Sequence, residues 1–358
     1  MILQDRGARF WVARFVKNSL NTLFIVLWIS ANVASMLALM LPFGLAFGGL
    51  AAIGAIAGVV AALLWRRQTA PRKAPSAQDV KSSLPPAIAS LADDLSEAVA
   101  RNEFFLVHQP KMRARSGEVQ AVETLIRWRH PTRGLIGPND FIALAEERGE
   151  MRRITEWVIR QAIVEQASLA ACGHAVTFNV NISARVLPDR DFAEWALATV
   201  SAASGPIGFE ITETAMIADP EGALRNLHLF ADAGIKIAID DYGAGLSSLA
   251  YLKQLPAHEL KIDRMFISGL SSSHRDPLLV RSTIDLAHAL DMEVTAEGVD
   301  SPAALALLKV MGCDVIQGFL IAMPMALGDL RSFLDARDDA TPEASLGFNW
   351  LGRAGRAS

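Results

Sequence analysis

Cysteine is scarce in this chain, and several patterns that define other classes of protein are absent. The 358 residues include two cysteines, Cys172 and Cys313, which lie far apart and lack a spacing typical of a metal site. This excludes a disulfide-stapled fold and fits a reducing compartment. The net charge of −4 is unremarkable, and no basic stretch interleaved with aromatic residues is present. The sequence therefore gives no sign of a nucleic acid polymer as partner.

Charge is absent from one long stretch: no Asp, Glu, Lys or Arg occurs from Asn18 to Trp65. One membrane-spanning helix needs ~20 apolar residues, so this stretch is long enough for two. Leu41-Pro-Phe-Gly44 has the chemistry of a turn near its middle. We therefore predict two transmembrane helices in residues 18–65. A cleaved signal peptide would be shorter, and a single long tilted span is the remaining alternative.

Basic residues lie on both sides of this apolar stretch. They are Arg6, Arg9, Arg14 and Lys17 before it, and Arg66, Arg67, Arg72 and Lys73 after it. The positive-inside rule then places both flanks in the cytoplasm. The expected order is a cytoplasmic segment at 1–17, the membrane hairpin at 18–65, a flexible linker at 66–87, a folded domain at 88–336 and a disordered tail at 337–358.

Short apolar segments alternate with amphipathic ones through the expected domain. The predicted strands are Phe104–Pro110, Glu118–Trp128, Ala175–Ile182, Ile207–Ile211, Ile235–Ile239, His258–Ile262, Glu293–Ala296 and Cys313–Ile316. The predicted helices include Ile88–Arg101, Ile154–Ala171, Phe192–Ser201, Pro220–Ala233, Pro277–Ala289, Pro302–Val310 and Leu327–Leu334. This alternation predicts a parallel α/β architecture, and roughly eight strand–helix units match a closed (β/α)₈ barrel. An open doubly wound sheet is the alternative, although no glycine-rich phosphate loop follows the first strand.

Polar side chains occur at or near the ends of successive predicted strands. They are Glu123, Asn181, Glu210, Asp240, Asp241, Lys261, Asp263, Glu297 and Gln317. Each alone has an ordinary explanation; the Asp240-Asp241 pair, for example, could cap a helix or form a turn. In a barrel, however, these strand ends point to one face. Carboxylates with one carboxamide suit Mg²⁺ or Mn²⁺ better than zinc, and without cations they would repel one another.

Seven motifs contain these residues in a characteristic order. They are Glu123-Thr-Leu-Ile-Arg-Trp128, Val180-Asn-Ile-Ser183, Phe209-Glu-Ile-Thr-Glu213, Asp240-Asp-Tyr-Gly-Ala-Gly245, Leu260-Lys-Ile-Asp-Arg264, Ala296-Glu-Gly-Val299 and Gly312-Cys-Asp-Val-Ile-Gln-Gly-Phe319. The order and spacing resemble those of the EAL family of cyclic di-GMP phosphodiesterases, from about Leu91 to Leu334. The resemblance implies a TIM-like barrel of the EAL type, two divalent cations (Mg²⁺ or Mn²⁺), and hydrolysis of cyclic di-GMP to linear pGpG. It also implies a role in motility or biofilm signalling, and the predicted hairpin, which lies outside the resemblance, adds an expected location in the bacterial inner membrane.

The resemblance also implies roles for individual residues. One metal is held by Glu123, Asn181, Glu210 and Asp240, and the second, or its water, by Asp240, Asp241 and Glu297. The catalytic set is Glu123, Lys261 and Glu297: Lys261 orients or helps to deprotonate the water, Glu297 is a candidate general base, and sequence alone does not separate these two roles. The expected substrate-binding residues are Gln109, Leu125, Arg127 and Gln317. Glu213 resembles the glutamate that anchors the loop Tyr242–Ser248 in the family.

Five positions depart from the family pattern without removing a metal ligand. Thr124 replaces alanine, Tyr242 phenylalanine, Leu246 tyrosine and Asp300 glutamate, and His108 stands where tyrosine is common. No Gly-Gly-Asp/Glu-Glu-Phe motif of a diguanylate cyclase is present. The resemblance thus implies a phosphodiesterase, which the predicted hairpin would anchor in the membrane, with a homodimer through the EAL domain as a common family arrangement. The alternatives are a catalytically weak receptor for cyclic di-GMP and a membrane signalling scaffold.

Overall fold

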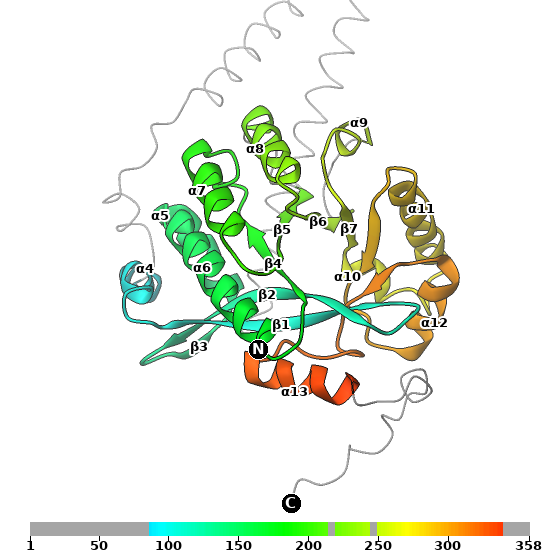
Figure 1. Ribbon diagram of the computed structural model, residues 1–358, viewed down its shortest axis with the longest axis horizontal. Coiled ribbons are helices and arrows are strands. Elements are labelled where there is room, and N and C mark those ends of the chain that lie inside the picture. The colour runs from blue at the N-terminus through cyan, green and yellow to red at the C-terminus, as the bar shows by residue number, and fades with distance from the viewer. Residues whose placement is uncertain (1–85, 214–218, 244–248, 339–358) are drawn as a thin grey trace, which may run out of the picture. The chain divides into compact units, whose positions relative to one another are not determined.

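A computed structural model describes residues 86–213, 219–243 and 249–338 (Figure 1). The chain divides into two compact units, 1–80 and 81–358, and every described residue belongs to the second. The predicted membrane hairpin, residues 66–85 of the predicted linker and the tail from residue 339 lie outside the described residues. Among the helices that are described, none combines the length and the apolar character needed to cross a membrane.

Eight strands form a closed barrel. Around the ring they follow the order β1, β9, β8, β7, β6, β5, β4, β2, and β2 then pairs with β1. Their bounds are β1 Phe104–Arg113, β2 Val119–His130, β4 Thr177–Ile182, β5 Ile207–Thr212, β6 Ile237–Tyr242, β7 Glu259–Ile262, β8 Glu293–Ala296 and β9 Val315–Ile316. A short strand, β3 (Gly134–Ile136), pairs with β2 outside the ring. The closed barrel is confirmed, and the open doubly wound sheet is excluded.

The prediction of a wholly parallel barrel is wrong at its first strand. β1 runs antiparallel to both of its neighbours in the ring, β2 and β9. A tight turn causes the reversal: Gly117, with φ of 77°, donates its N–H to the carbonyl of Arg113 at 3.0 Å. A parallel connection would need a crossover of a dozen or more residues, which this turn does not provide. All other neighbouring pairs in the ring are parallel.

Helices lie outside the barrel. They are α4 Pro86–Ala98, α5 Pro138–Arg148, α6 Met151–Ala170, α7 Arg190–Ser201, α8 Pro220–Asp232, α9 Leu249–Leu252, α10 Arg264–Ile267, α11 Asp276–His288, α12 Pro302–Met311 and α13 Leu327–Asp338. α7 begins two residues earlier than predicted. The side chain of Asp189 caps it there by accepting hydrogen bonds from the N–H groups of Asp191 and Phe192.

The two ends of the predicted domain also extend further than expected. α4 begins at Pro86, inside the predicted linker, and α13 continues to Asp338, inside the predicted tail. α13 packs on β1 and α6, and Arg337 near its end donates to the carbonyl of Gly117 at 2.7 Å. The last helix therefore covers the β1 side of the barrel, where the β1–β2 turn leaves no room for a crossover helix.

The barrel interior is strongly polar, whereas the surrounding shell is apolar. Phe178 on β4, Phe209 on β5 and Phe230 on α8 are fully buried, and the rings of Phe209 and Phe230 pack together between strand and helix. Glu210 and Lys261 are completely buried as well, and Lys111 is 2% exposed. The interior of a barrel of this class is ordinarily packed with branched apolar residues. Buried charges are tolerated only when they are paired, so these interior side chains point to a functional site.

Candidate functional site

The ammonium group of Lys261, on β7, gathers four of the predicted carboxylates around itself. Its Nζ lies 2.5 Å from Glu210 Oε2, 2.7 Å from Glu297 Oε1, 2.9 Å from Asp240 Oδ1 and 3.4 Å from Glu123 Oε2. These acids come from β5, the end of β8, β6 and β2. The convergence predicted from strand ends is therefore present, and Lys261 lies at its centre.

The carboxylates form two overlapping groups with the spacing of cation ligands. Glu123, Glu210 and Asp240 each offer one oxygen within 4.8 Å of the others, and so do Asp240, Asp241 and Glu297. Asp240 belongs to both groups. Two overlapping groups with one shared acid are the arrangement that a pair of neighbouring divalent cations would use.

A bulge in β6 brings Asp240 and Asp241 to the same site. Neighbouring residues of a regular strand point to opposite faces. Here Ile239 pairs with Leu260 and Tyr242 with Ile262, so the two aspartates lie opposite the single residue Lys261. Asp241 has φ of 56°, a conformation that a non-glycine residue rarely adopts. The prediction that the aspartates follow the strand is wrong, because they lie within it, and the bulge aims both inward.

Glu210 and Lys261 are charged partners despite complete burial. Burial alone would raise the pKa of Glu210, but Lys111 and Lys261 outweigh it and lower that pKa to about 2. Burial likewise opposes the charge on Lys261, while Glu123, Glu210, Glu297 and Asp240 raise its pKa well above the ordinary value. Lys261 is therefore a permanent ammonium group in the metal-free protein.

The pKa values of Asp240 and Glu297 are raised, whereas that of Glu210 is lowered. Burial and the nearby charges of Glu210 and Glu123 raise the pKa of Asp240 to about 6, although Lys261 opposes this. Burial, with the charges of Asp240 and Glu123, raises the pKa of Glu297 to about 8. The metal-free site therefore holds more acid than its single central ammonium group compensates, and it takes up protons near neutral pH.

We expect the affinity for Mn²⁺ to rise with pH between about 5.5 and 8.5. Divalent cations bind the ionised carboxylates, so below pH 6 they must displace protons from Asp240 and Glu297. As pH rises through each pKa this competition disappears, and the affinity levels off above the pKa of about 8. Titration calorimetry in buffers of different ionisation enthalpy measures the released protons. An affinity independent of pH across this range would contradict the assignment of these two acids as ligands.

Gln317 and Gln109 extend the site beyond the carboxylates. Gln317 Nε2 donates to Glu123 Oε2 at 2.6 Å and to Gln109 Oε1 at 3.1 Å, and Gln109 in turn donates to the carbonyl of Ala322. Gln317 Oε1 is buried and has no hydrogen-bond partner among the described residues. A buried acceptor without a donor is unfavourable unless a ligand or water supplies one, so it marks space for a bound group.

The remaining predicted residues lie beside this site. Asn181 Nδ2 donates to Glu123 Oε1 at 3.1 Å. Glu123, Leu125 and Arg127 are alternate residues of β2, which places them on one face of the strand. Arg127 is partly exposed, and burial lowers its pKa although Glu123 opposes this. All predicted ligands and substrate-binding residues therefore lie at or beside one end of the barrel.

Glu213 has the contact expected of a loop anchor. Its Oε2 accepts the backbone N–H of Gly243 at 3.1 Å, directly after β6. Residues 244–248 of the predicted loop, including Leu246, lie outside the described residues. Tyr242 is half-buried, and burial and the charge of Glu213 raise its pKa.

Two departures from the family pattern, His108 and Thr124, lie opposite each other and away from the site. His108 and Thr124 are partners across the β1–β2 ladder, and His108 Nδ1 lies 3.3 Å from Thr124 Oγ1. His108 Nε2 lies 2.6 Å from Glu165 Oε2 on α6. Thr124 adjoins Glu123 in the strand and so faces the other way. The pair alters the packing of the barrel on α6 and leaves the acidic cluster untouched, while Asp300 is exposed.

Three polar residues next to the site, two of them buried and Glu259 partly buried, were not predicted. Lys111, Asn179 and Glu259 lie in the barrel two positions from Gln109, Asn181 and Lys261 along their strands. The alternation of strand side chains was the signal that could have found them, because residues two apart share a face. Lys111 and Asn179 both donate to Glu210 Oε1 at 3.1 Å.

The donor set fits a divalent cation that prefers oxygen. The two groups supply carboxylate oxygens, and the carboxamides of Asn181 and Gln317 adjoin them. Neither cysteine belongs to them, and no histidine does. This chemistry favours Mg²⁺ or Mn²⁺ over zinc.

A closed α/β barrel with a cluster of carboxylates at the carboxyl ends of its parallel strands defines the general class of this protein. Within that class, residues 92–324 match the EAL domain. The chain belongs to the EAL domain family.

Similar proteins agree with this assignment. The cyclic di-GMP phosphodiesterase NbdA of Pseudomonas aeruginosa is 37% identical over 257 residues, which cover 70% of this chain and 33% of that protein. The cyclic di-GMP phosphodiesterase PdeR of Escherichia coli is 36% identical over 238 residues, covering 66% of this chain and 36% of that protein. The chain thus spans about a third of the length of these curated relatives.

Solved structures match the same region. The phosphodiesterase PaMucR in complex with c-di-GMP is 37% identical, with a TM-score of 0.64, and the match covers 67% of this chain and 99% of that one. The EAL enzyme Bd1971 in its cAMP- and cyclic-di-GMP-bound form is 29% identical, with a TM-score of 0.65, covering 79% of this chain and 76% of that one.

Proposed function

We propose that this chain is a cyclic di-GMP phosphodiesterase that opens one phosphodiester bond and releases linear pGpG. The observation that carries the proposal is the intact acidic cluster around Lys261, in which every predicted metal ligand is present. Relatives named as cyclic di-GMP phosphodiesterases share this domain at 36–37% identity. Lowering the concentration of this second messenger would affect motility and biofilm signalling.

Two divalent cations, Mg²⁺ or Mn²⁺, fit the two carboxylate groups. Glu123, Asn181, Glu210 and Asp240 would hold one, and Asp240, Asp241 and Glu297 the other. Bound there, the cations would supply an acidified water and neutralise charge on the phosphate. Asp240, shared by both groups, would fix their spacing.

The protein's own groups divide the proton chemistry between them. Four carboxylates keep Lys261 protonated, so it acts as a donor that orients the attacking water or a phosphate oxygen. In the metal-free protein burial raises the pKa of Glu297 to about 8, so this carboxyl holds a proton more strongly than an ordinary glutamate, which makes it the candidate general base. On this proposal Glu297 would accept the proton, and Lys261 would position the reactants.

Substrate contacts come from β1, β2 and the segment after β9. Arg127 is partly exposed and lies on the same face of β2 as Glu123. Its guanidinium group would bind a phosphate oxygen. Leu125 would contact a base, while Gln109 and Gln317 would hold the phosphate side of the nucleotide. Cyclic di-GMP would thus bind across the carboxyl ends of the strands.

The membrane anchor is a proposal that rests on the uncharged stretch Asn18–Trp65 and its basic flanks. The protein would be a multi-pass protein of the bacterial inner membrane with its EAL domain in the cytoplasm. Fractionation of bacteria expressing the full chain tests this. We expect the chain in the membrane pellet after a carbonate wash, and recovery in the soluble fraction would contradict the anchor.

Homodimerisation through the EAL domain is a second proposal, supported by the frequency of such dimers in the family. Light scattering coupled to size-exclusion chromatography of the purified full chain should give twice the mass of 38.6 kDa. A monomeric mass at micromolar concentration would contradict it.

The phosphodiesterase proposal is tested by incubating the purified full chain with cyclic di-GMP and Mg²⁺ or Mn²⁺. Mass spectrometry should identify pGpG. Chelation with EDTA should stop its formation, because the carboxylates need a bound cation to acidify the attacking water. Folded protein that forms no pGpG with either cation would overturn the proposal. Nucleotide binding without turnover in that experiment would instead identify a cyclic di-GMP receptor.

A further inference from the structure

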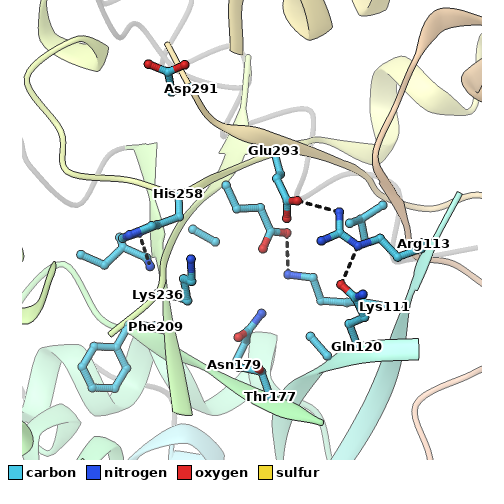
Figure 2. Close-up of a pocket in the computed structure, with 15 residues that line it drawn as sticks. Lys111, Arg113, Gln120, Thr177, Asn179, Phe209, Lys236, His258, Asp291 and Glu293 are labelled. Atoms are coloured by element: carbon cyan, nitrogen blue, oxygen red, sulfur yellow. Dashed lines mark hydrogen bonds and ion pairs between the residues drawn. The ribbon is translucent and has the colours of Figure 1, made fainter. Parts of the chain in front are cut away.

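A polar cavity lies at the end of the barrel opposite the acidic cluster. It has a volume of about 390 Å³ and is lined by residues at the amino ends of the parallel strands, among them Thr177, Ile237 and Glu293 (Figure 2). Lys111, Asn179 and Glu259 project into it from β1, β4 and β7. Gly208 on β5 leaves room for the Asn179 side chain, because a Cβ atom there would lie 2.4 Å from Asn179 Oδ1.

Lys111 connects this cavity to the acidic cluster. Its Nζ lies 3.1 Å from Glu210 Oε1 and 2.5 Å from Glu259 Oε1. Asn179 Nδ2 donates to the same oxygen of Glu210 at 3.1 Å, and Thr295 Oγ1 donates to the same oxygen of Glu259. Lys111 is 2% exposed and Glu210 is completely buried, so leaving either charge without a partner would be costly.

The two oxygens of Glu210 therefore face different partners. Oε1 receives Lys111 and Asn179 from the cavity side, whereas Oε2 receives Lys261 at 2.5 Å from the side of the acidic cluster. Two donors on Oε1 fix the rotation of the carboxylate and leave Oε2 directed at the site. A ligand held this way needs no reorientation when a cation binds.

We propose that Lys111, assisted by Asn179, is a positioning residue that holds Glu210 in its metal-binding orientation from the far side of the barrel. Lys111 does not touch the substrate face, and its charge is balanced by Glu259. The proposal rests on the proposed function only for its effect on hydrolysis, since the orientation of Glu210 also governs the binding of Mn²⁺ by itself.

Removing Lys111 alone would change both orientation and charge, so the test removes a neutral pair. The K111M/E259Q double variant keeps the net charge and loses the contact with Glu210. R113M/E293Q is the matched control, because Arg113 Nη1 and Glu293 Oε1 form a 2.7 Å pair in the same cavity that does not involve Glu210. Figure 2 shows the control pair at the side of the cavity.

Mn²⁺ binding by the purified full chain is measured by titration calorimetry, and cyclic di-GMP hydrolysis at saturating Mn²⁺ is measured beside it. We expect K111M/E259Q to bind Mn²⁺ about tenfold more weakly and to lower kcat about tenfold with KM unchanged, while the control pair stays within twofold of wild type. Mn²⁺ affinity and kcat within twofold of wild type in K111M/E259Q would overturn the proposal.

A milder variant distinguishes loss of the positioning role from a folding defect. N179A retains every charge and removes the second donor to Glu210 Oε1, so we expect Mn²⁺ affinity to fall about threefold. If K111M/E259Q does not fold, N179A decides, and wild-type affinity in N179A then overturns the proposal. Wild-type protein that binds Mn²⁺ but forms no pGpG would refute the phosphodiesterase proposal, and the Mn²⁺ comparison would still decide the role of Lys111.

Discussion

Replacing Asp240 with asparagine is expected to reduce hydrolysis of cyclic di-GMP by about a thousandfold or more. Asp240 supplies an oxygen to both carboxylate groups, so one substitution weakens both proposed cation sites. Loss of a metal-held water and of charge neutralisation removes about 4 kcal/mol or more of transition-state stabilisation. Initial rates at saturating Mn²⁺, followed by chromatography, measure the effect.

The fold of D240N should survive the substitution. Burial raises the pKa of Asp240 to about 6, so its ionisation costs the folded metal-free protein stability, and this loss is complete above about pH 6. A neutral asparagine removes that penalty, so the melting temperature at pH 7.5 should equal or exceed that of wild type. D285N, which changes an exposed aspartate of α11, is the matched control and should retain full activity. A D240N enzyme with more than a tenth of wild-type turnover would contradict the shared-ligand arrangement.

Replacing Lys261 with methionine is expected to destabilise the metal-free protein by about 3–5 kcal/mol. Lys261 is the ammonium group at the centre of four carboxylates, and its removal leaves buried acids without compensation. For a domain of this size that loss lowers the melting temperature by roughly 10 °C. Millimolar Mn²⁺ should restore much of it, because bound cations replace the missing positive charge.

Turnover by K261M should fall about 10²–10⁴-fold even when Mn²⁺ restores its stability, since the residue that orients the water or phosphate is gone. K309M, at an exposed position of α12, is the matched control for loss of one lysine. Thermal scans with and without Mn²⁺ separate the two effects. A melting temperature of K261M equal to that of wild type in EDTA would show that Lys261 does not compensate the acids.

The sequence predicted the barrel and the acidic end because both depend on short-range patterns. Apolar strands alternating with amphipathic helices define the closed barrel, and polar residues such as Glu210 and Glu297 at strand ends converge once it closes. The antiparallel direction of β1 was harder to predict from the sequence. A turn around Gly117 joins β1 to β2, yet the direction of β1 relative to the whole ring depends on its pairing with both β2 and β9.

Other features depend on contacts between distant strands and were therefore missed. The bulge that aims both Asp240 and Asp241 inward exists because two residues of β6 lie opposite one of β7. Lys111 was overlooked because the inner layers of such barrels are ordinarily apolar, and its partner Glu210 is far away in sequence. The alternation of strand side chains identifies such a residue only after its strand is known to face the interior.

The account is tested most directly by counting pGpG molecules formed per protein molecule over time, with cyclic di-GMP in large excess and Mn²⁺ present. It predicts many equivalents of pGpG, one for each cyclic di-GMP consumed, and none after EDTA treatment. Cyclic di-GMP recovered unchanged from a folded protein that binds both Mn²⁺ and the nucleotide would contradict it.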